Sequence, residues 1–297
     1  MTSSLSPDDV EPGRCRAIAS LLRRARPVVA KYTEGDPNWE GATHSQLAAE
    51  RVTAQLVAGE PFEIALSQAI SIAQLYVFAI LQHLDALSVL FESDPPPAYA
   101  IGLVARSVVE VGARAWWIVE PDVTAEVRVA RGFVEKLASL RDVDRTSIDT
   151  DGRVTPAAVG LSYDADALIA DVRALGMPTE RNRRRDTIGG QFRPSATKLV
   201  GQFLERDMPE SCRAVYPLLS ANAHGTLWAI TLHFTADPPD ATQRVAATYR
   251  VTQGWLDGPA NVALLALCWT LERISSLLGW PTEPVLALLS EADDLFA

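Results

Sequence analysis

One stretch constrains the fold more than any other: residues 97–119, PAYAIGLVARSVVEVGARAWWIV. It is apolar on nearly every side of a helix, but Arg106, Glu110 and Arg114 follow one another at four-residue spacing and form a single charged stripe. A helix this apolar must be surrounded by protein on most of its sides. The sequence therefore predicts a core helix whose stripe faces either water or a polar cleft.

Composition narrows the classes of protein that this chain can belong to. Its 297 residues carry a formal net charge of −10, which disfavours a general nucleic-acid or anionic-membrane binder, because neutralising phosphates needs clustered basic side chains. The three cysteines, Cys15, Cys212 and Cys268, lie far apart without a CxxC pair, which predicts free thiols and a cytoplasmic protein. No metal-ligand spacing and no phosphate-binding glycine motif is present, so we expect no metal, no cofactor and no membrane span.

Hydrophobic periodicity, broken by proline and glycine, predicts an all-α fold: a multi-helix bundle of about nine to ten helices, with a short β-hairpin near 240–252. We expect residues 1–12 to form a disordered N-terminal tail and residues 13–297 to form a single helical domain. Three local features are predicted to set helix ends: a capping box over Thr43–Gln46, a cap at Asp122 and a helix start at Pro259.

Two further helices show polar stripes. The segment 61–92 has polar residues every three or four positions and is otherwise apolar, so we expect it to be a core helix. In the segment 122–145, four charged residues share roughly one side: Arg128, Arg131, Glu135 and Arg141.

Three groups of residues could carry chemistry. Arg106 and Glu110 form either a simple i, i+4 ion pair or a cleft-lining pair in which Arg106 holds an anion and Glu110 orients it. Ser220 and His224 share a helix face, where His224 is either a packed histidine or an acid/base group. We add Arg114 and Asn222 as candidate ligand contacts.

The third group is the segment 177–194, which is rich in arginine and contains Gly189 and Gly190. We expect an exposed basic loop. Its Arg184 and Arg185 are either simply solvated or a flexible clamp on a phosphate or another anion.

Three segments together resemble a group of uncharacterised bacterial helical proteins related to the HEPN superfamily: 105–110 (ARSVVE), 193–200 (RPSATKLV) and 216–226 (YPLLSANAHGT). The resemblance implies a helical bundle, often dimeric, that acts on RNA or transfers nucleotides in defence or toxin–antitoxin systems. Ribonuclease members carry Arg and His four to six residues apart on one helix. In this chain Ser220 stands where such an Arg would be, so the guanidinium would have to come from Arg106 on a neighbouring helix.

Three hypotheses follow. The first is an enzyme for a phosphodiester or nucleotide, with Arg106 as anion clamp, Glu110 as its orienter, His224 as acid/base and Ser220 as hydrogen-bond partner. The second is a binding protein for a small anionic ligand, RNA or nucleotide without turnover. The third is a homodimeric scaffold joined through an apolar helix face, in which the same Arg, Glu and His residues form a structural network.

Overall fold

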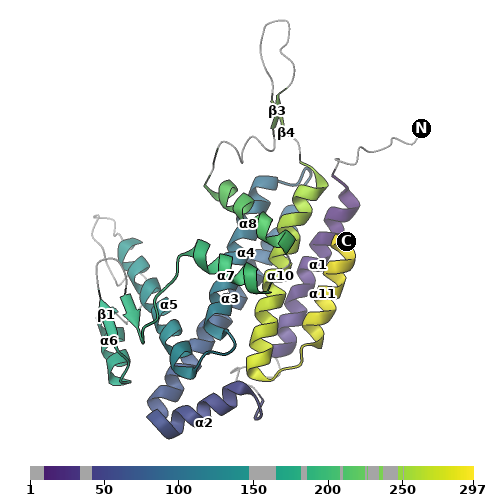
Figure 1. Ribbon diagram of the computed structural model, residues 1–297. Helices are drawn as coiled ribbons and strands as arrows, with labels where there is room; N and C mark the ends of the chain where they lie inside the picture. The colour runs from purple at the N-terminus through teal and green to yellow at the C-terminus, as the bar shows by residue number, and fades with distance from the viewer. Residues whose placement is uncertain are drawn as a thin grey trace, which may run out of the picture.

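The computed structural model describes residues 10–33, 42–146, 165–181, 186–207, 210–224, 226, 234–236, 247–249 and 251–297 (Figure 1). Within these ranges the chain forms ten helices and two short antiparallel strand pairs, which confirms the predicted all-α bundle with a hairpin. The helices are α1 (Pro12–Thr33), α2 (Gln46–Ala58), α3 (Glu60–Phe91), α4 (Ala98–Val119), α5 (Ala125–Thr146), α6 (Ala165–Ala174), α7 (Ala196–Asp207), α8 (Glu210–Ala223), α10 (Gln253–Leu278) and α11 (Glu283–Phe296). The strands are β1 (Thr179–Arg181), β2 (Asp186–Ile188), β3 (Phe234–Ala236) and β4 (Ala247–Tyr249).

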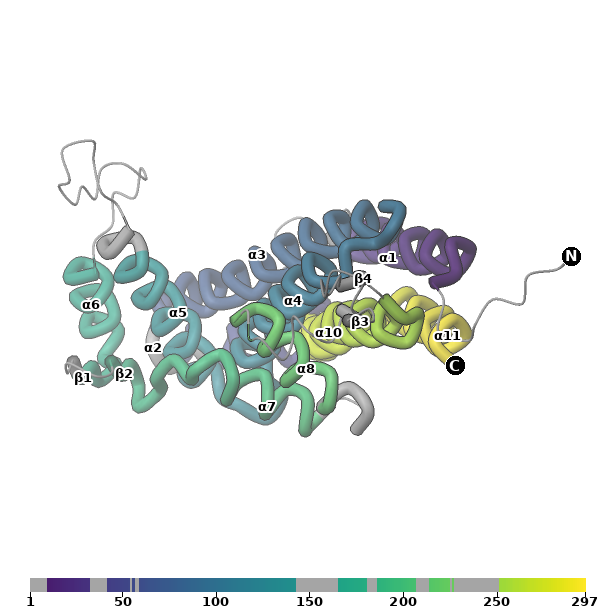
Figure 2. Tube along the Cα trace, turned by 90° about the horizontal axis from the view of Figure 1, so that it is seen from above, coloured from purple at the N-terminus to yellow at the C-terminus, as the bar shows by residue number. Residues whose placement is uncertain are grey.

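The helix that the sequence singles out is the centre of the bundle. α4 contacts α3, α10, α8, α7 and α5, and Figure 2 shows it between α3 and α10. Every residue from Ala115 to Val119 is buried, whereas Arg106, Glu110 and Arg114 keep partial exposure. The prediction of an apolar helix surrounded by protein, with one polar stripe, is confirmed.

Both strand pairs are short hairpins. β3 pairs with β4, and Phe234 lies opposite Tyr249, which confirms the hairpin expected near 240–252. β1 pairs with β2 beside α5, so the segment 177–194 is not the plain loop that we expected.

Helix ends are set by residues close to the predicted ones. Ser45, not Thr43, caps α2 by accepting a hydrogen bond from the Ala48 amide (3.1 Å). At α5 the Thr124 hydroxyl accepts from the Val127 amide (3.4 Å), so the predicted cap at Asp122 is wrong. The predicted start of α10 at Pro259 is also wrong, because the helix begins at Gln253 and is capped by Thr252.

The N-terminal segment joins the bundle before residue 13. The Glu11 amide donates to the Gln253 side-chain oxygen (3.0 Å), and α1 begins at Pro12. Residues 10–12 of the predicted tail therefore lie against α10, and residues 1–9 are outside the described residues.

Only part of the apolar surface of α3 is buried in the bundle. By length and composition alone, α3 and α10 could each cross a membrane, but the apolar window of α10 is 72% buried within the bundle and that of α3 only 44%. Ile64, Leu75, Phe78 and Val89 of α3 are exposed. The expected core helix is therefore buried along one side, and part of its apolar surface stays exposed.

The close crossing of α3 and α5 depends on Gly132. A Cβ at this position would lie 2.6 Å from the Cβ and 2.8 Å from the Cα of Ala69. We expect Gly132→Ala to force the helices apart and lower the free energy of unfolding by about 1–3 kcal/mol. Gly201→Ala in α7 is the matched control, because nothing lies within 4 Å of its Cβ and alanine gains about 0.5–1 kcal/mol there. Urea unfolding measures both, and equal behaviour of the two variants would contradict the close crossing.

Candidate functional site

The charged residues of the α4 stripe interact with two different helices, α8 and α5. The Nε of Arg106 donates to Oε1 of Glu110 (2.7 Å), as an i, i+4 pair should. Arg114 turns away from Glu110, and its Nη1 donates to both carboxylate oxygens of Glu135 on α5 (3.1 and 3.2 Å). Arg106 and Arg114 therefore belong to separate polar clusters.

The first cluster includes α8, the helix that carries the predicted serine and histidine. The Tyr216 hydroxyl donates to Oε1 of Glu110 (3.0 Å), so Glu110 binds both Arg106 and Tyr216. Burial, reinforced by the Glu110 charge, raises the pKa of Tyr216. The predicted approach of this segment to the stripe on α4 is thus present, but tyrosine makes the contact, and neither Ser220 nor His224 does.

Asn222 of α8 is a completely buried polar residue. It packs against Gly102 of α4, where a Cβ would meet its Nδ2 at 2.7 Å. Within the described ranges neither amide atom of Asn222 has a hydrogen-bond partner. Asn222 lies between α4 and α8, and its role as a ligand contact stays a prediction.

Among the remaining predicted residues, the structure describes Ser220 and His224. Ser220 is half-buried, and its backbone carbonyl accepts from the His224 amide (3.1 Å). His224 follows the last turn of α8, and its side chain is exposed. Among the described residues no hydrogen bond or ion pair joins this side chain to Arg106 or Glu110. Arg184 and Arg185 lie outside the described residues, and the chemical roles assigned to all of these groups stay predictions.

The second cluster is built around Glu135, whose side chain is completely buried. Besides Arg114, it pairs with Arg193 (3.1 Å) and accepts a hydrogen bond from the Tyr76 hydroxyl (2.8 Å). Burial, followed by the Glu135 charge, strongly raises the pKa of Tyr76. This cluster joins α3, α4, α5 and the segment before α7 through ion pairs and hydrogen bonds that meet at one buried carboxylate.

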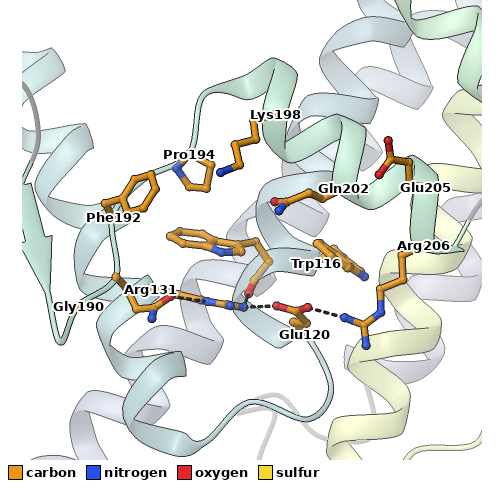
Figure 3. A pocket seen from close by; sticks show the side chains of 12 residues that line it. Trp116, Glu120, Arg131, Gly190, Phe192, Pro194, Lys198, Gln202, Glu205 and Arg206 are labelled. Carbon is orange, nitrogen blue, oxygen red and sulfur yellow. Dashed lines mark hydrogen bonds and ion pairs between the residues drawn. The ribbon is translucent and has the colours of Figure 1, made fainter.

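A pocket of about 590 Å³ lies beyond the stripe, where the end of α4 faces α5 and α7 (Figure 3). This volume is within the usual range of small-molecule sites. Adjacent tryptophans of α4, Trp116 and Trp117, contribute aromatic surface, and Phe192 lies on the opposite wall. Polar side chains complete the lining: Glu120, Arg131, Gln191, Lys198, Gln202, Glu205 and Arg206.

Glu120 organises the charges of this pocket. It pairs with Arg131 (2.6 Å) and with Arg206 (2.5 Å), and Figure 3 shows its carboxylate between the two guanidinium groups. Each guanidinium also lies over a tryptophan: Arg131 is 5.2 Å from the ring of Trp117, and Arg206 is 5.9 Å from that of Trp116. Both arginines are therefore held in place before any ligand binds.

Lys198 supplies the third cation. Its ammonium lies 5.8 Å from the ring centre of Phe192, and within the described residues no carboxylate pairs with it. Arg131 donates through Nη1 to the Trp117 carbonyl (2.6 Å), and burial lowers the pKa of this guanidinium. The arrangement offers aromatic faces, an exposed ammonium and paired guanidinium groups, which together suit a flat ligand that carries an anionic group.

Metal binding and thiol chemistry find less support among the described residues. No three His, Cys, Asp or Glu side chains of the described residues are grouped so as to hold a metal ion. Burial raises the pKa of Cys15 and that of Cys268, which disfavours the reactive thiolate form of both. Both thiols are buried in the apolar core.

The pocket lies at the carboxyl end of the central helix, and Trp116, Trp117 and Glu120 were not among the predicted site residues. A pair of tryptophans followed by a carboxylate at a helix end was a usable signal, because tryptophan is seldom completely buried and its polar neighbours tend to gather at element ends. Lys198 lies in one of the segments quoted for the family resemblance.

Comparisons with protein-family models, with characterised proteins and with solved structures found no match to this chain. The chemistry of the site therefore rests on the geometry described above.

Proposed function

We propose that this protein binds a nucleotide, a flat base joined to phosphate, in the pocket between α4, α5 and α7. The observation that supports the proposal is the convergence of Lys198, Arg131 and Arg206 with the aromatic side chains of Trp117 and Phe192 in one pocket of about 590 Å³. Among the charged groups lining it, three are basic and two are acidic, so the pocket is locally positive in a chain whose net charge is −10.

Each part of the nucleotide has a matching partner. Aromatic faces bind bases of any sequence by stacking, which contributes about 1–3 kcal/mol per base. Lysine and arginine bind phosphate oxygens through charge-assisted hydrogen bonds. Because Glu120 already holds both arginines, little side-chain freedom is lost when the ligand enters, which favours affinity.

The HEPN-like relationship remains part of this proposal. One of the three segments that carry the resemblance, 193–200, contributes Pro194 and Lys198 to the pocket wall. The cluster of Arg106, Glu110 and Tyr216 is a separate candidate for acid/base work. An alternative is that this cluster only fixes the helices, which is favoured by the mutual hydrogen bonds of its three members.

Lys198→Ala tests the binding site. With wild-type protein, we expect AMP, ATP or GTP to raise the melting temperature in a concentration-dependent way, and Lys198→Ala to weaken binding by roughly 10- to 100-fold, the loss expected for one charged hydrogen bond. Lys31→Ala, which removes an exposed lysine of α1 away from the pocket, is the matched control and should bind normally. Equilibrium dialysis gives the dissociation constants.

Two outcomes would contradict the proposal. One is the absence of any stabilisation by the three nucleotides, and the other is equal binding by Lys198→Ala and wild type. Ribose 5-phosphate separates the contributions of the two ligand parts. If it binds as tightly as AMP, the aromatic side chains do not hold a base.

A further inference from the structure

An uncovered stripe runs along the whole outer side of α3. Its members recur at alternating steps of four and three residues, the spacing at which two helices pack along each other. They are Ile64, Gln68, Ser71, Leu75, Phe78, Gln82, Asp85 and Val89. All are exposed except Asp85, which is partly exposed and paired with Arg26. Figure 2 shows α3 along one edge of the bundle.

The stripe reads the same in both directions. About a midpoint between Leu75 and Phe78, the order is apolar, polar, polar, apolar and then apolar, polar, polar, apolar. The two members of each pair lie at the same distance from this midpoint, so Ile64 corresponds to Val89 and Ser71 corresponds to Gln82. A two-fold symmetric contact needs a surface that is complementary to itself, and a palindromic helix stripe provides one when two copies run antiparallel.

The distribution of charged residues along α3 also favours a second copy of this chain as the partner. Between Glu63 and Asp85 the sequence of α3 contains no aspartate, glutamate, lysine or arginine. Two copies can therefore approach without burying an unpaired charge at the centre. In the antiparallel arrangement the one charged member, Asp85 with its Arg26, meets the Gln68 amide, a neutral group that can donate to the carboxylate.

We propose that a second copy of this chain packs antiparallel on the α3 stripe and forms a two-fold symmetric dimer. Leu75 of each copy lies against Phe78 of the other at the centre, and Ile64 lies against Val89 at both ends. Ser71 meets Gln82 between them. A hollow of about 380 Å³ between α3 and α5, lined by Ile72, Leu75 and Tyr76, lies beside the position of the incoming Phe78 ring.

The size of the contact indicates its strength. Eight positions over 25 steps of 1.5 Å give a contact about 38 Å long, and a helix about 10 Å wide then covers roughly 400 Å² per copy. A stable interface of standard size covers about 800 Å² per partner. The dimer is therefore expected to dissociate on dilution through the micromolar range, unless the flanking hollow contributes further area.

Sedimentation velocity of the full chain over a concentration series tests the dimer. We expect a shift from monomer to dimer for wild type, and Phe78→Glu to weaken association by roughly 100-fold, because it places two unpaired carboxylates at the centre of the contact. Leu75→Glu is the second variant. The matched control is Leu286→Glu, an exposed apolar residue of α11 with 52% exposure that lies off the stripe. Circular dichroism confirms that each variant is folded.

Cysteine crosslinking tests the register. Under mild oxidation, an equal mixture of the Ile64→Cys and Val89→Cys proteins should form a disulfide-linked heterodimer, whereas each protein alone should not crosslink through its new cysteine. A crosslink of Ile64→Cys to itself would mean a parallel pair and would overturn the antiparallel arrangement. The unmodified chain, with its native cysteines, is the control for background oxidation.

Three further results would overturn the proposal. The first is a monomer at every concentration, and the second is association that Phe78→Glu and Leu75→Glu leave unchanged. The third is binding of wild type, but not of Phe78→Glu, to vesicles of phosphatidylcholine and phosphatidylglycerol without dimer formation, which would assign the stripe to a lipid surface. None of these results depends on the nucleotide pocket, so the two proposals fail separately.

Discussion

Replacing Arg128 by methionine is expected to lower the free energy of unfolding by about 3–5 kcal/mol, the cost of breaking a buried ion pair by removing one partner. The side chain of Arg128 is completely buried. It binds both carboxylate oxygens of Glu50 on α2 (3.1 and 3.2 Å) and donates to the carbonyls of Ile118 and Glu120 (3.1 and 3.0 Å). Methionine fills a similar volume but satisfies none of these groups.

A double variant separates charge from packing. Adding Glu50→Leu to Arg128→Met removes the unpaired carboxylate, so part of the lost stability should return, although the carbonyls of Ile118, Glu120 and Val123 still lose the donor that Arg128 supplied. The matched control is Arg24→Met, which breaks an exposed pair with Glu291 and should change stability by less than about 1 kcal/mol. Urea unfolding followed by circular dichroism gives all four values. If Arg128→Met lowered the free energy of unfolding by less than about 1 kcal/mol, the contacts of Arg128 with α2 and the end of α4 would not stabilise the fold as proposed.

Arg128 also shows why the charged side of α5 was hard to interpret from the sequence. Four charged residues on one side of a helix normally face water, and nothing local marks Arg128 or Glu135 as different from Arg141. The difference comes from what lies opposite: α2 and the end of α4 enclose Arg128, and α3 and α4 enclose Glu135. Burial of these charges depends on partners 10 to 78 positions away on other helices, and periodicity within one helix cannot supply them.

The central helix could be predicted because its signal is local. Residues 97–119 are apolar on nearly every side, so any fold must enclose them. The cap of α2 was nearly predictable, but Thr43 and Ser45 are both good caps, and the contact of this turn with Gly279 of α10 favours the second. The aromatic pocket needed long-range information, since Trp117, Arg131 and Lys198 come from three helices whose packing the sequence does not specify.

Replacing Glu135 by glutamine is the second large change that we expect. It leaves Arg114 and Arg193 facing each other without the carboxylate between them, and it should lower the free energy of unfolding by about 3–5 kcal/mol. The hydroxyl of Tyr76 can still donate to the amide oxygen, so the loss reflects charge more than the hydrogen bond to Tyr76. Asp142→Asn, which weakens a longer and more exposed contact with Arg193 (3.5 Å), is the matched control and should be nearly neutral.

The same variant should change the stability of the protein in alkali. The pKa of Tyr76 is raised in the folded protein by burial and by Glu135, so the stability contributed by its neutral form is present below the unfolded pKa of about 10 and is lost as the pH rises above it. In Glu135→Gln the carboxylate no longer opposes ionisation, so the pKa of Tyr76 falls but stays raised by burial. Urea unfolding between about pH 9 and pH 11 should therefore show the steepest loss for wild type, a shallower one for Glu135→Gln and the shallowest for Tyr76→Phe. Equal slopes for wild type and Tyr76→Phe would mean that the pKa of Tyr76 is not raised in the folded protein.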